Sequence, residues 1–410
     1  MILAEQNGRT IPKEDKVFGI SNRAKAMIKA EGKDKVINAT IGSLLDDDGN
    51  LVVLSSVVEV LKDLEPTDYA DYAPIGGIPE FKEAIVKAAF CSFEPKSSFV
   101  EVVGTPGGTG AIRAIVGNYS KEGDTILTSD WCWANYKSIA DEIGRTLSTF
   151  RMLDDGGAFD ADALGAKVAE IMEKQDSLVL LINTPAHNPT GYSLTDSDWD
   201  NMIENLKKTA KEGKRITLFL DVAYIDFAGE PDEVRGFLPK LEDLPENILP
   251  VIGYSTSKTF TLYGMRCGAA ICLAKTKEIA DEFKMVCQYS ARASWSNSPR
   301  PAQKVIANIY ADPKLLAKVD EERAKWIEVL SRRGRAFDEE AKKVGLETVP
   351  YDSVFFTSIP CSNADRIAAK LEKQGVFLVP LARGLRVSVA SVSEKACRAL
   401  PAIIKACMDE

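Results

Sequence analysis

The feature that most constrains the fold is the alternation of short apolar runs with longer polar or amphipathic segments between residues 100 and 275. Such alternation is typical of βα units that build a mainly parallel sheet. The predicted strands are Val100–Val103, Thr125–Thr128, Ser177–Ile182, Arg215–Leu220, Pro250–Tyr254 and Ala269–Leu273. Helical patterns lie between several of them, for example at Ala111–Tyr119 and Asp196–Ala210. We therefore expect an α/β fold whose mainly parallel sheet is covered by helices.

The sequence after Pro301 changes in character and predicts a smaller α+β domain. Residues 313–344 are rich in Lys, Glu, Ala, Arg and Leu, with apolar residues at helical spacing, and predict one long amphipathic helix. Strand-like pieces follow at TVPYDSVFFTSIP (348–360) and FLVPLARGLRVSVA (377–390), around another helix. We expect a large domain of residues 48–310, and a small domain of residues 1–47 and 311–410.

Charge and hydropathy exclude several classes of partner. The chain has 51 basic and 60 acidic residues, a net charge of −9 and a pI of about 5.1. No general field attracts nucleic acid or anionic lipid. No stretch approaches the ~20 apolar residues of a membrane span, and Met1–Thr10 lacks the pattern of a signal peptide. We expect a cytoplasmic protein with neither nucleic-acid nor membrane partners.

Cysteine and histidine usage narrows the chemistry. The eight cysteines form no Cys-x-x-Cys pair, and a chain of this length does not need disulfides. His187 is the only histidine, which excludes a multi-histidine metal site. We expect no metal, and we expect catalysis to depend on a group other than imidazole.

Polar and aromatic residues follow the predicted strands, at the sheet edge where open α/β folds bind ligands. These residues are the glycine-rich turn Gly104–Gly110, Trp131 and Trp133, Asn188 in a proline-set loop, Asp221 with Tyr224, and Ser255, Ser257 and Lys258 with Arg266. Taken singly, each has a plain alternative: a tight turn, a surface tryptophan, a turn asparagine, a helix cap or a solvated charge. Together they favour an aromatic, phosphate-bearing ligand with an electrophilic carbon.

Pyridoxal 5′-phosphate meets those requirements. The Lys258 amine would form an imine with its aldehyde, a carboxylate would keep its ring nitrogen protonated, and a phenol would bond its ring hydroxyl. Ser255, Ser257 and Arg266 would hold phosphate oxygens, and arginine can do so through a bidentate fork.

Eight motifs make the chain resemble the fold-type I pyridoxal-phosphate aminotransferases, and within them the aspartate/aromatic aminotransferase group. They occur in the family's order and near its spacing. The motifs are DYAPIGGIPEF, GGTGAIR, WANY, AHNPTG, DVAY, SxSKxFxLYGMRCG, RASWSNSP and GLRVSVA. The resemblance implies a large cofactor-binding domain at 48–310 and a reversible ping-pong transfer of an amino group between an L-amino acid and a 2-oxo acid.

The resemblance also implies the roles of the cofactor-site residues. Lys258 would hold the cofactor and carry the proton, Asp221 would pair with the ring nitrogen, and Tyr224 and Asn188 would bond the ring oxygen. Trp133 would stack on the ring. The residues that match phosphate contacts are Gly108, Thr109, Ser255, Ser257, Arg266 and, from a neighbouring subunit, Tyr72. The expected assembly is a homodimer with shared sites.

The substrate would be held by further residues that the resemblance implies. Arg386 matches the arginine for the α-carboxylate, and Gly42 lies in a segment that closes over substrate, which places residues 12–47 in the small domain. Trp133 and Asn188 would also contact substrate. Arg292 falls where dicarboxylate-specific members have an arginine from the partner subunit, although a solvated helix arginine is its plain alternative.

Three departures from the family pattern argue against narrow aspartate specificity. Gly107 stands where a serine is common, Tyr136 replaces a histidine that supports the aspartate in the aspartate-specific group, and ARGLRV differs from the usual approach to Arg386. The expected substrates are therefore aspartate, glutamate or aromatic amino acids. Two alternatives are a lyase or decarboxylase that uses the same cofactor and a non-catalytic sensor domain, for which the chain offers no basic recognition helix.

Overall fold

The computed structural model describes residues 3, 14–210, 213–351 and 355–410. They form two compact units. The first contains Val53–Thr184 and Leu194–Glu322, and the second contains Pro185–Ser193, Arg323–Glu410 and the described part of Ile11–Val52. Residues 1–2 and 4–13 of the predicted small domain, and residues 352–354 of a predicted strand piece, lie outside the described residues. The boundaries of the two predicted domains stay a prediction.

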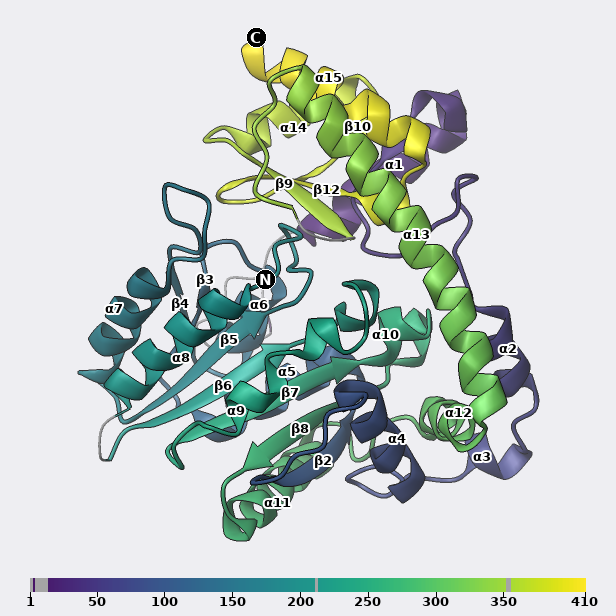
Figure 1. Ribbon diagram of the computed structural model, residues 1–410. Helices are drawn as coiled ribbons and strands as arrows, with labels where there is room; N and C mark the ends of the chain where they lie inside the picture. Colours follow the sequence, from purple (N-terminus) through teal and green to yellow (C-terminus); the bar gives the residue numbers. More distant parts are fainter. Residues whose placement is uncertain (1–2, 4–13, 211–212, 352–354) are drawn as a thin grey trace. The chain divides into compact units, whose positions relative to one another are not determined.

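A seven-stranded sheet forms the centre of the first unit (Figure 1). In spatial order its strands are β2 (Phe99–Thr105), β8 (Gly268–Ala274), β7 (Ile248–Ser255), β6 (Arg215–Asp221), β5 (Ser177–Asn183), β3 (Thr125–Ser129) and β4 (Thr146–Phe150). Neighbours from β7 to β4 are parallel, whereas β8 is antiparallel to both β7 and β2. The prediction of a mainly parallel sheet covered by helices is confirmed.

All six predicted strands of this sheet coincide with observed ones, and β4 was not predicted. β5 is buried at every position, as expected for a strand covered on both faces, and its continuous apolar run is easy to recognise. Four of the five residues of β4, Thr-Leu-Ser-Thr-Phe, are exposed or half-exposed, and three carry hydroxyl groups. As an edge strand it needs little apolar character, so its sequence gives a weak signal.

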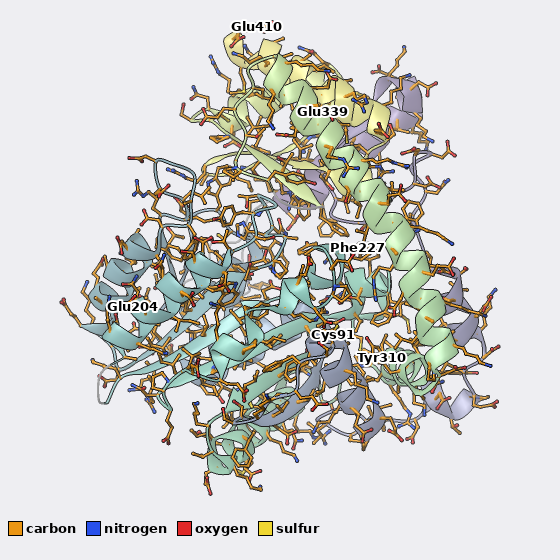
Figure 2. All side chains as sticks on the ribbon, viewed as in Figure 1. Cys91, Glu204, Phe227, Tyr310, Glu339 and Glu410 are labelled. Atoms are coloured by element: carbon orange, nitrogen blue, oxygen red, sulfur yellow. The ribbon has the colours of Figure 1, made fainter. Side chains whose placement is uncertain are left out.

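Helices cover the sheet and connect its strands. In chain order they are α2 (Ser55–Lys62), α3 (Pro66–Ala70), α4 (Pro79–Phe90), α5 (Gly107–Tyr119), α6 (Asn135–Glu142), α7 (Ala161–Met172), α8 (Asp196–Thr209), α9 (Leu238–Leu241), α10 (Thr256–Thr259), α11 (Lys277–Ser294) and α12 (Arg300–Ala311). Buried residues of α5, α6 and α11 form one apolar cluster with the sheet. Helices α7 and α8 pack against each other (Figure 1). Glu204, which is labelled in Figure 2, is an exposed residue of α8. It pairs with Lys208 of the same helix.

The second unit is smaller and has its own core. The helix α13 (Pro313–Lys343), predicted at 313–344, begins in the first unit and ends in the second. The other elements are α1 (Lys16–Glu31), β1 (Ile37–Asn38), β9 (Phe356–Pro360), α14 (Ala364–Lys373), β10 (Val376–Phe377), β11 (Val379–Pro380), β12 (Gly384–Ser388) and α15 (Glu394–Asp409). Strand β12 lies between β11 and β9, and β1 pairs with β10. Apolar residues of α13, α14, α15, β9, β10 and β12 form the core, and Ile37 of β1 packs against it.

Short 3-10 helices complete the structure. They are Lys33–Lys35, Ile225–Phe227, Glu233–Arg235, Tyr263–Met265 and Val389–Ser391. Two of them, at 225–227 and 263–265, lie in the loops that carry predicted site residues. Throughout the described part of the chain, every helix is too short or too polar to cross a membrane.

Candidate active site

Lys258 lies in the first unit, on the short helix α10 that directly follows β7. The side chain of Ser255 caps this helix by accepting a hydrogen bond from the Ser257 N–H. Lys258 is half-buried, and its Nζ is 5.2 Å from the centroid of the Tyr224 ring. Because Tyr224 follows β6, two neighbouring parallel strands bring an amine and a phenol ring together at the same sheet edge.

Asp221 is the last residue of β6 and is 7% exposed. Its Oδ2 accepts a hydrogen bond from the Tyr136 hydroxyl at 2.7 Å, and Oδ1 accepts one from the Ala223 N–H at 3.3 Å. Burial raises the pKa of the Asp221 carboxyl, whereas the Tyr136 hydrogen bond and the charge of Lys258 lower it. The site therefore holds a buried carboxylate that a cationic partner would stabilise.

A buried network supports the turn that carries Lys258, and the sequence did not predict it. The Asp226 Oδ2 accepts a hydrogen bond from the Thr259 hydroxyl at 2.7 Å and another from the Tyr254 hydroxyl, and Asp226 also pairs with Arg235, which is 2% exposed. Asp226 thus joins the loop after β6 to the residue next to Lys258. The signal in the sequence is an acidic residue within an apolar run, Ala-Tyr-Ile-Asp-Phe. The next residue, Phe227, which is labelled in Figure 2, is buried with 1% of its surface exposed.

The N-terminus of α5 and Arg266 form a second part of the site. Helix α5 starts at Gly107, and no side chain of the described residues caps its first N–H groups, which makes this terminus suitable for an anion. A Cβ atom on Gly107 would lie 2.6 Å from Arg266 Nη2, and the φ of Gly107 is +73°. Arg266 Nη1 donates hydrogen bonds to Ser257 Oγ at 3.2 Å and to the Tyr263 carbonyl at 2.9 Å.

The backbone conformation at Arg266 and Gly268 sets the positions of the groups around the start of α5. Arg266 has φ 48° and ψ 61°, in the left-handed region that non-glycine residues rarely adopt. Gly268 was not predicted as part of the site, yet a Cβ there would lie 2.6 Å from the Tyr254 carbonyl oxygen and 2.7 Å from the Gly107 carbonyl carbon. This glycine lets β8 approach the start of α5.

Three other predicted site residues, Gly108, Thr109 and Trp133, are half-exposed. Gly108 and Thr109 lie in the first turn of α5, and the ring of Trp133 meets that of Tyr136 edge-on.

The second unit brings together Arg386, Asn188 and Gly42. Arg386 Nη1 donates a hydrogen bond to Asn188 Oδ1 at 3.2 Å, and Nη2 donates one to the Thr40 carbonyl at 2.6 Å. The guanidinium carbon lies 4.5 Å from the centroid of the Phe356 ring. A Cβ on Gly42 would lie 2.6 Å from Phe356 Cζ. The position of Phe356 beside Arg386 and Gly42 was not predicted from the sequence.

Tyr72 and Arg292 belong to an exposed part of the first unit. The Tyr72 side chain is 82% exposed, and its carbonyl accepts a hydrogen bond from Arg300 Nη1 at 3.2 Å. Arg292 is exposed and donates a hydrogen bond to Ser296 Oγ. Among the described residues, Tyr72 thus bonds to Arg300 and Arg292 bonds to Ser296, and neither of these bonds involves Lys258 or Asp221.

The first unit therefore offers a set of groups that fits pyridoxal 5′-phosphate. An amine, a buried carboxylate, a phenol, a half-exposed indole, an uncapped helix N-terminus and an arginine all belong to one sheet edge. The helix N-terminus and the arginine suit a phosphate dianion, and the carboxylate suits a protonated ring nitrogen. Among the described residues, no group of three or more His, Cys, Asp or Glu side chains could hold a metal ion.

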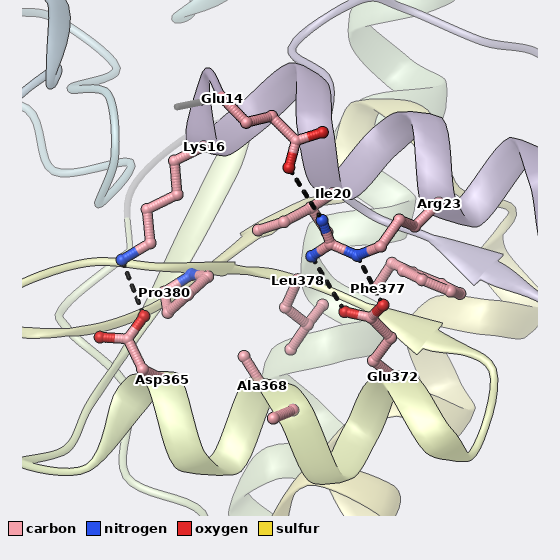
Figure 3. Close-up of a pocket in the computed structure, with 11 residues that line it drawn as sticks. Glu14, Lys16, Ile20, Arg23, Asp365, Ala368, Glu372, Phe377, Leu378 and Pro380 are labelled. Atoms are coloured by element: carbon pink, nitrogen blue, oxygen red, sulfur yellow. Dashed lines mark hydrogen bonds and ion pairs between the residues drawn. The ribbon is translucent and has the colours of Figure 1, made fainter. Parts of the chain in front are cut away.

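A pocket of about 380 Å³ lies elsewhere, between α1 and α14 of the second unit (Figure 3). Its charged residues face one another. Arg23 bonds to Glu372 at 2.7 Å and to Glu14 at 3.3 Å, and Lys16 pairs with Asp365 at 2.8 Å. None of the predicted site residues lines it. Because its charges already neutralise one another, this pocket is a poor candidate for the active site.

Comparisons with known proteins agree with this geometry. The sequence model of the family "Aminotransferase class I and II" matches residues 34–404. An aromatic-amino-acid aminotransferase of Escherichia coli (strain K12) is 25% identical over 368 residues, which cover 87% of this chain and 89% of the relative. An aspartate aminotransferase of Salmonella typhi is 26% identical over 405 residues, which cover 95% and 98%. A solved aminotransferase structure from Anaerococcus prevotii is 36% identical, with a TM-score of 0.95 over 100% of this chain and 99% of that one.

Proposed function

This chain belongs to the class I and II aminotransferase family and is a pyridoxal-phosphate-dependent transferase, in which we propose that Lys258 carries the cofactor and moves the proton. The observation that supports this role most strongly is the position of the Lys258 Nζ, 5.2 Å from the Tyr224 ring centroid. The amine also lies near enough to the buried Asp221 to influence its ionisation. The described sheet edge offers no other lysine with both neighbours.

The proposed cofactor contacts follow from the chemistry of each group. When bound, the cofactor supplies an aldehyde for the amine and a ring that accepts electrons from the substrate Cα. Asp221 would hold the proton of the ring nitrogen, Tyr224 and Asn188 would donate to the ring oxygen, and Trp133 would cover the ring. The phosphate would be held by Gly108, Thr109, Ser255, Ser257 and Arg266.

Lys258 would act as the general acid and base once an incoming amino acid displaces it. Its helix is anchored by the Ser255 cap and by the bond from Thr259 to Asp226. An amine held by an ordered turn is already positioned to take a proton from one atom and return it to another. Such positioning lowers the activation barrier for proton transfer. The support under α10 is therefore consistent with the proposed role.

The proposed substrates are L-amino acids and 2-oxo acids, with aspartate, glutamate and aromatic amino acids as the first candidates. Arg386 would bind the α-carboxylate through its guanidinium fork. Its hydrogen bonds to Asn188 and the Thr40 carbonyl, and the Phe356 ring beside it, orient the fork. Gly42 leaves room for the Phe356 ring, and its segment is proposed to close over the bound substrate.

We propose a homodimer in which Tyr72 and Arg292 serve the partner's site. Met285 and Tyr289, 64% and 81% exposed, stand one turn apart on α11, and Arg292 follows them at helical spacing. Tyr72 is also among the large exposed side chains of the first unit. Exposed apolar residues grouped in this way are typical of protein interfaces. A cytoplasmic location is likewise a proposal.

The test is a paired assay of the purified protein with its cofactor. Aspartate or phenylalanine is mixed with 2-oxoglutarate, and glutamate is measured against the matching 2-oxo product. We expect equal amounts of the two products. Lys258→Ala should remove the pH-dependent visible band that depends on the lysine amine and lower turnover by ~10²–10⁴-fold, the contribution typical of a proton-transfer residue.

The control is Lys284→Ala, which removes a half-exposed amine of the same unit that pairs with Glu101, and it should change neither absorption nor turnover. Pyruvate or carbon dioxide formed without matching glutamate would favour a lyase or decarboxylase instead. Cofactor binding without any turnover across a panel of amino acids would favour the sensor alternative. Full activity of Lys258→Ala would contradict the proposed role of the lysine.

A further inference from the structure

We propose that Tyr136 is a positioning residue for the transamination, whose phenol fixes the Asp221 carboxylate and leaves its remaining lone pairs to the cofactor. This inference rests on the proposed pairing of Asp221 with the ring nitrogen. Tyr136 itself would touch neither the substrate nor the reacting atoms, and it would act through Asp221.

The first support is the hydrogen bond between the two side chains. Tyr136 lies in the first turn of α6 and Asp221 at the end of β6, 85 residues apart. The hydroxyl donates to Asp221 Oδ2 at 2.7 Å, and the two residues are 1% and 7% exposed. Water has little access to this bond, so losing the donor would leave a buried carboxylate oxygen without compensation.

The second support is the rigidity of the tyrosine ring. Tyr136 belongs to the apolar cluster that α5, α6 and α11 form with the sheet. Its ring centroid lies 5.6 Å from that of Trp133, at an interplanar angle of 85°. The same side chain therefore contacts the carboxylate proposed for the ring nitrogen and the indole proposed to stack on the ring. A ring held by packing can fix the direction of its hydroxyl.

The third support is that this donor keeps its proton over a wide pH range. Burial and the nearby Asp221 raise the pKa of the Tyr136 phenol well above its usual value. The other titratable groups near the pair are Lys258, Tyr224 and Cys132, and burial raises the pKa of Cys132 to about 11. An imidazole, whose unperturbed pKa is about 6.5, would change its charge and its donor pattern much closer to neutral pH. A phenol with a raised pKa instead stays protonated between pH 5 and 9 and donates the same hydrogen bond throughout that range.

The experiment compares Tyr136→Phe, Tyr136→His and a control, Tyr119→Phe, each as full-length protein. Tyr119 packs against the same apolar cluster, and its hydroxyl has no hydrogen-bond partner among the described residues. Two quantities are measured between pH 5 and 9: the dissociation constant of pyridoxal 5′-phosphate, and the protonation of its ring nitrogen by ¹⁵N NMR of labelled cofactor.

We expect Tyr136→Phe to weaken cofactor binding by about tenfold, the loss typical of a hydrogen bond to a charged group. The protonated fraction of the ring nitrogen should also fall at the upper end of the pH range. Tyr136→His should restore binding at low pH but show a titration step between pH 5 and 9 that the wild-type protein lacks. Tyr119→Phe should behave as the wild type.

A double-variant cycle separates positioning from general support of the fold. If Tyr136 acts through Asp221, Tyr136→Phe should add little to the weaker binding of Asp221→Asn. Additive effects, or wild-type binding and NMR behaviour of Tyr136→Phe, would overturn the inference while leaving the proposed function intact. A wild-type protein whose bound cofactor has an unprotonated ring nitrogen would instead contradict the proposed role of Asp221.

Discussion

The Asp221 cluster and the Arg266 cluster lie in the same unit but are built in opposite ways. Asp221 is 7% exposed and is bonded by a side chain, Tyr136, and by a backbone N–H. Arg266 is exposed, and its position depends on a left-handed backbone, a glycine neighbour and the Ser257 hydroxyl. One cluster relies on burial and the other on conformation.

The difference indicates what each cluster can control. In a buried place with low dielectric, a charge strongly affects the protonation of its partner. In an exposed place solvent weakens charge effects, so the geometry of the donors matters more. We infer that the Asp221 cluster governs reactivity, whereas the Arg266 cluster governs how firmly and in which direction the phosphate is held.

The largest expected effect is on turnover in Asp221→Asn. An amide cannot hold the proton of the ring nitrogen as a carboxylate does, so the ring would accept electrons less readily. We expect turnover at saturating cofactor to fall by about 10²–10³-fold, as found for loss of one preorganised electrostatic group. Single-turnover kinetics with aspartate, followed at the visible band, measures this change.

The matched comparison is Arg266→Lys, which should weaken cofactor binding about tenfold and leave turnover at saturation nearly unchanged. Equal losses of turnover in the two variants would break the distinction between the clusters. So would an Asp221→Asn protein that turns over at the wild-type rate.

An intermediate effect is expected for Gly107→Ala. The new Cβ would lie 2.6 Å from Arg266 Nη2, and alanine is strained at φ +73°. The arginine would have to move, so we expect about a tenfold loss of cofactor affinity and about 1 kcal/mol of lost stability. Titration with cofactor and urea unfolding measure the two quantities.

Gly264→Ala is the control, because a Cβ at that glycine meets no atom within 4 Å. If the strain acts through Arg266, the affinity losses of Gly107→Ala and Arg266→Ala should not add. Additive losses would mean that Gly107 contributes to phosphate binding independently of the arginine.

The sequence could predict the groups at the ends of strands but not the contacts between distant segments. Lys258 and Asp221 follow apolar runs that are buried in β7 and β6, so their position at one edge could be expected. The bond between Tyr136 and Asp221 and the closeness of Gly107 to Arg266 depend on tertiary packing. No local pattern encodes them. The antiparallel direction of β8 could not be predicted either, because the hydrophobic pattern of a strand does not depend on its direction.

The smallest expected effect concerns the stability of the cofactor-free protein. Burial raises the pKa of Asp221 in the folded state. A carboxyl of this kind stabilises the fold fully below its unfolded pKa, and the contribution is lost as the pH rises through the folded pKa. Asn does not titrate. We therefore expect cofactor-free Asp221→Asn to become more stable relative to the wild type between pH 4 and 7, by on the order of 1 kcal/mol.

Asp232→Asn provides a control of opposite sign. Hydrogen bonds from the Ser92 hydroxyl and N–H lower the pKa of Asp232, so its contribution is present above the unfolded pKa and is lost as the pH falls. Asp232→Asn should therefore lose stability relative to the wild type as the pH rises from 4 to 7. If both variants change in the same direction in urea unfolding, burial does not dominate at Asp221. The carboxylate would then be stabilised by its partners before any cofactor binds, and the contrast between a buried reactive cluster and an exposed anchoring cluster would lose its physical basis.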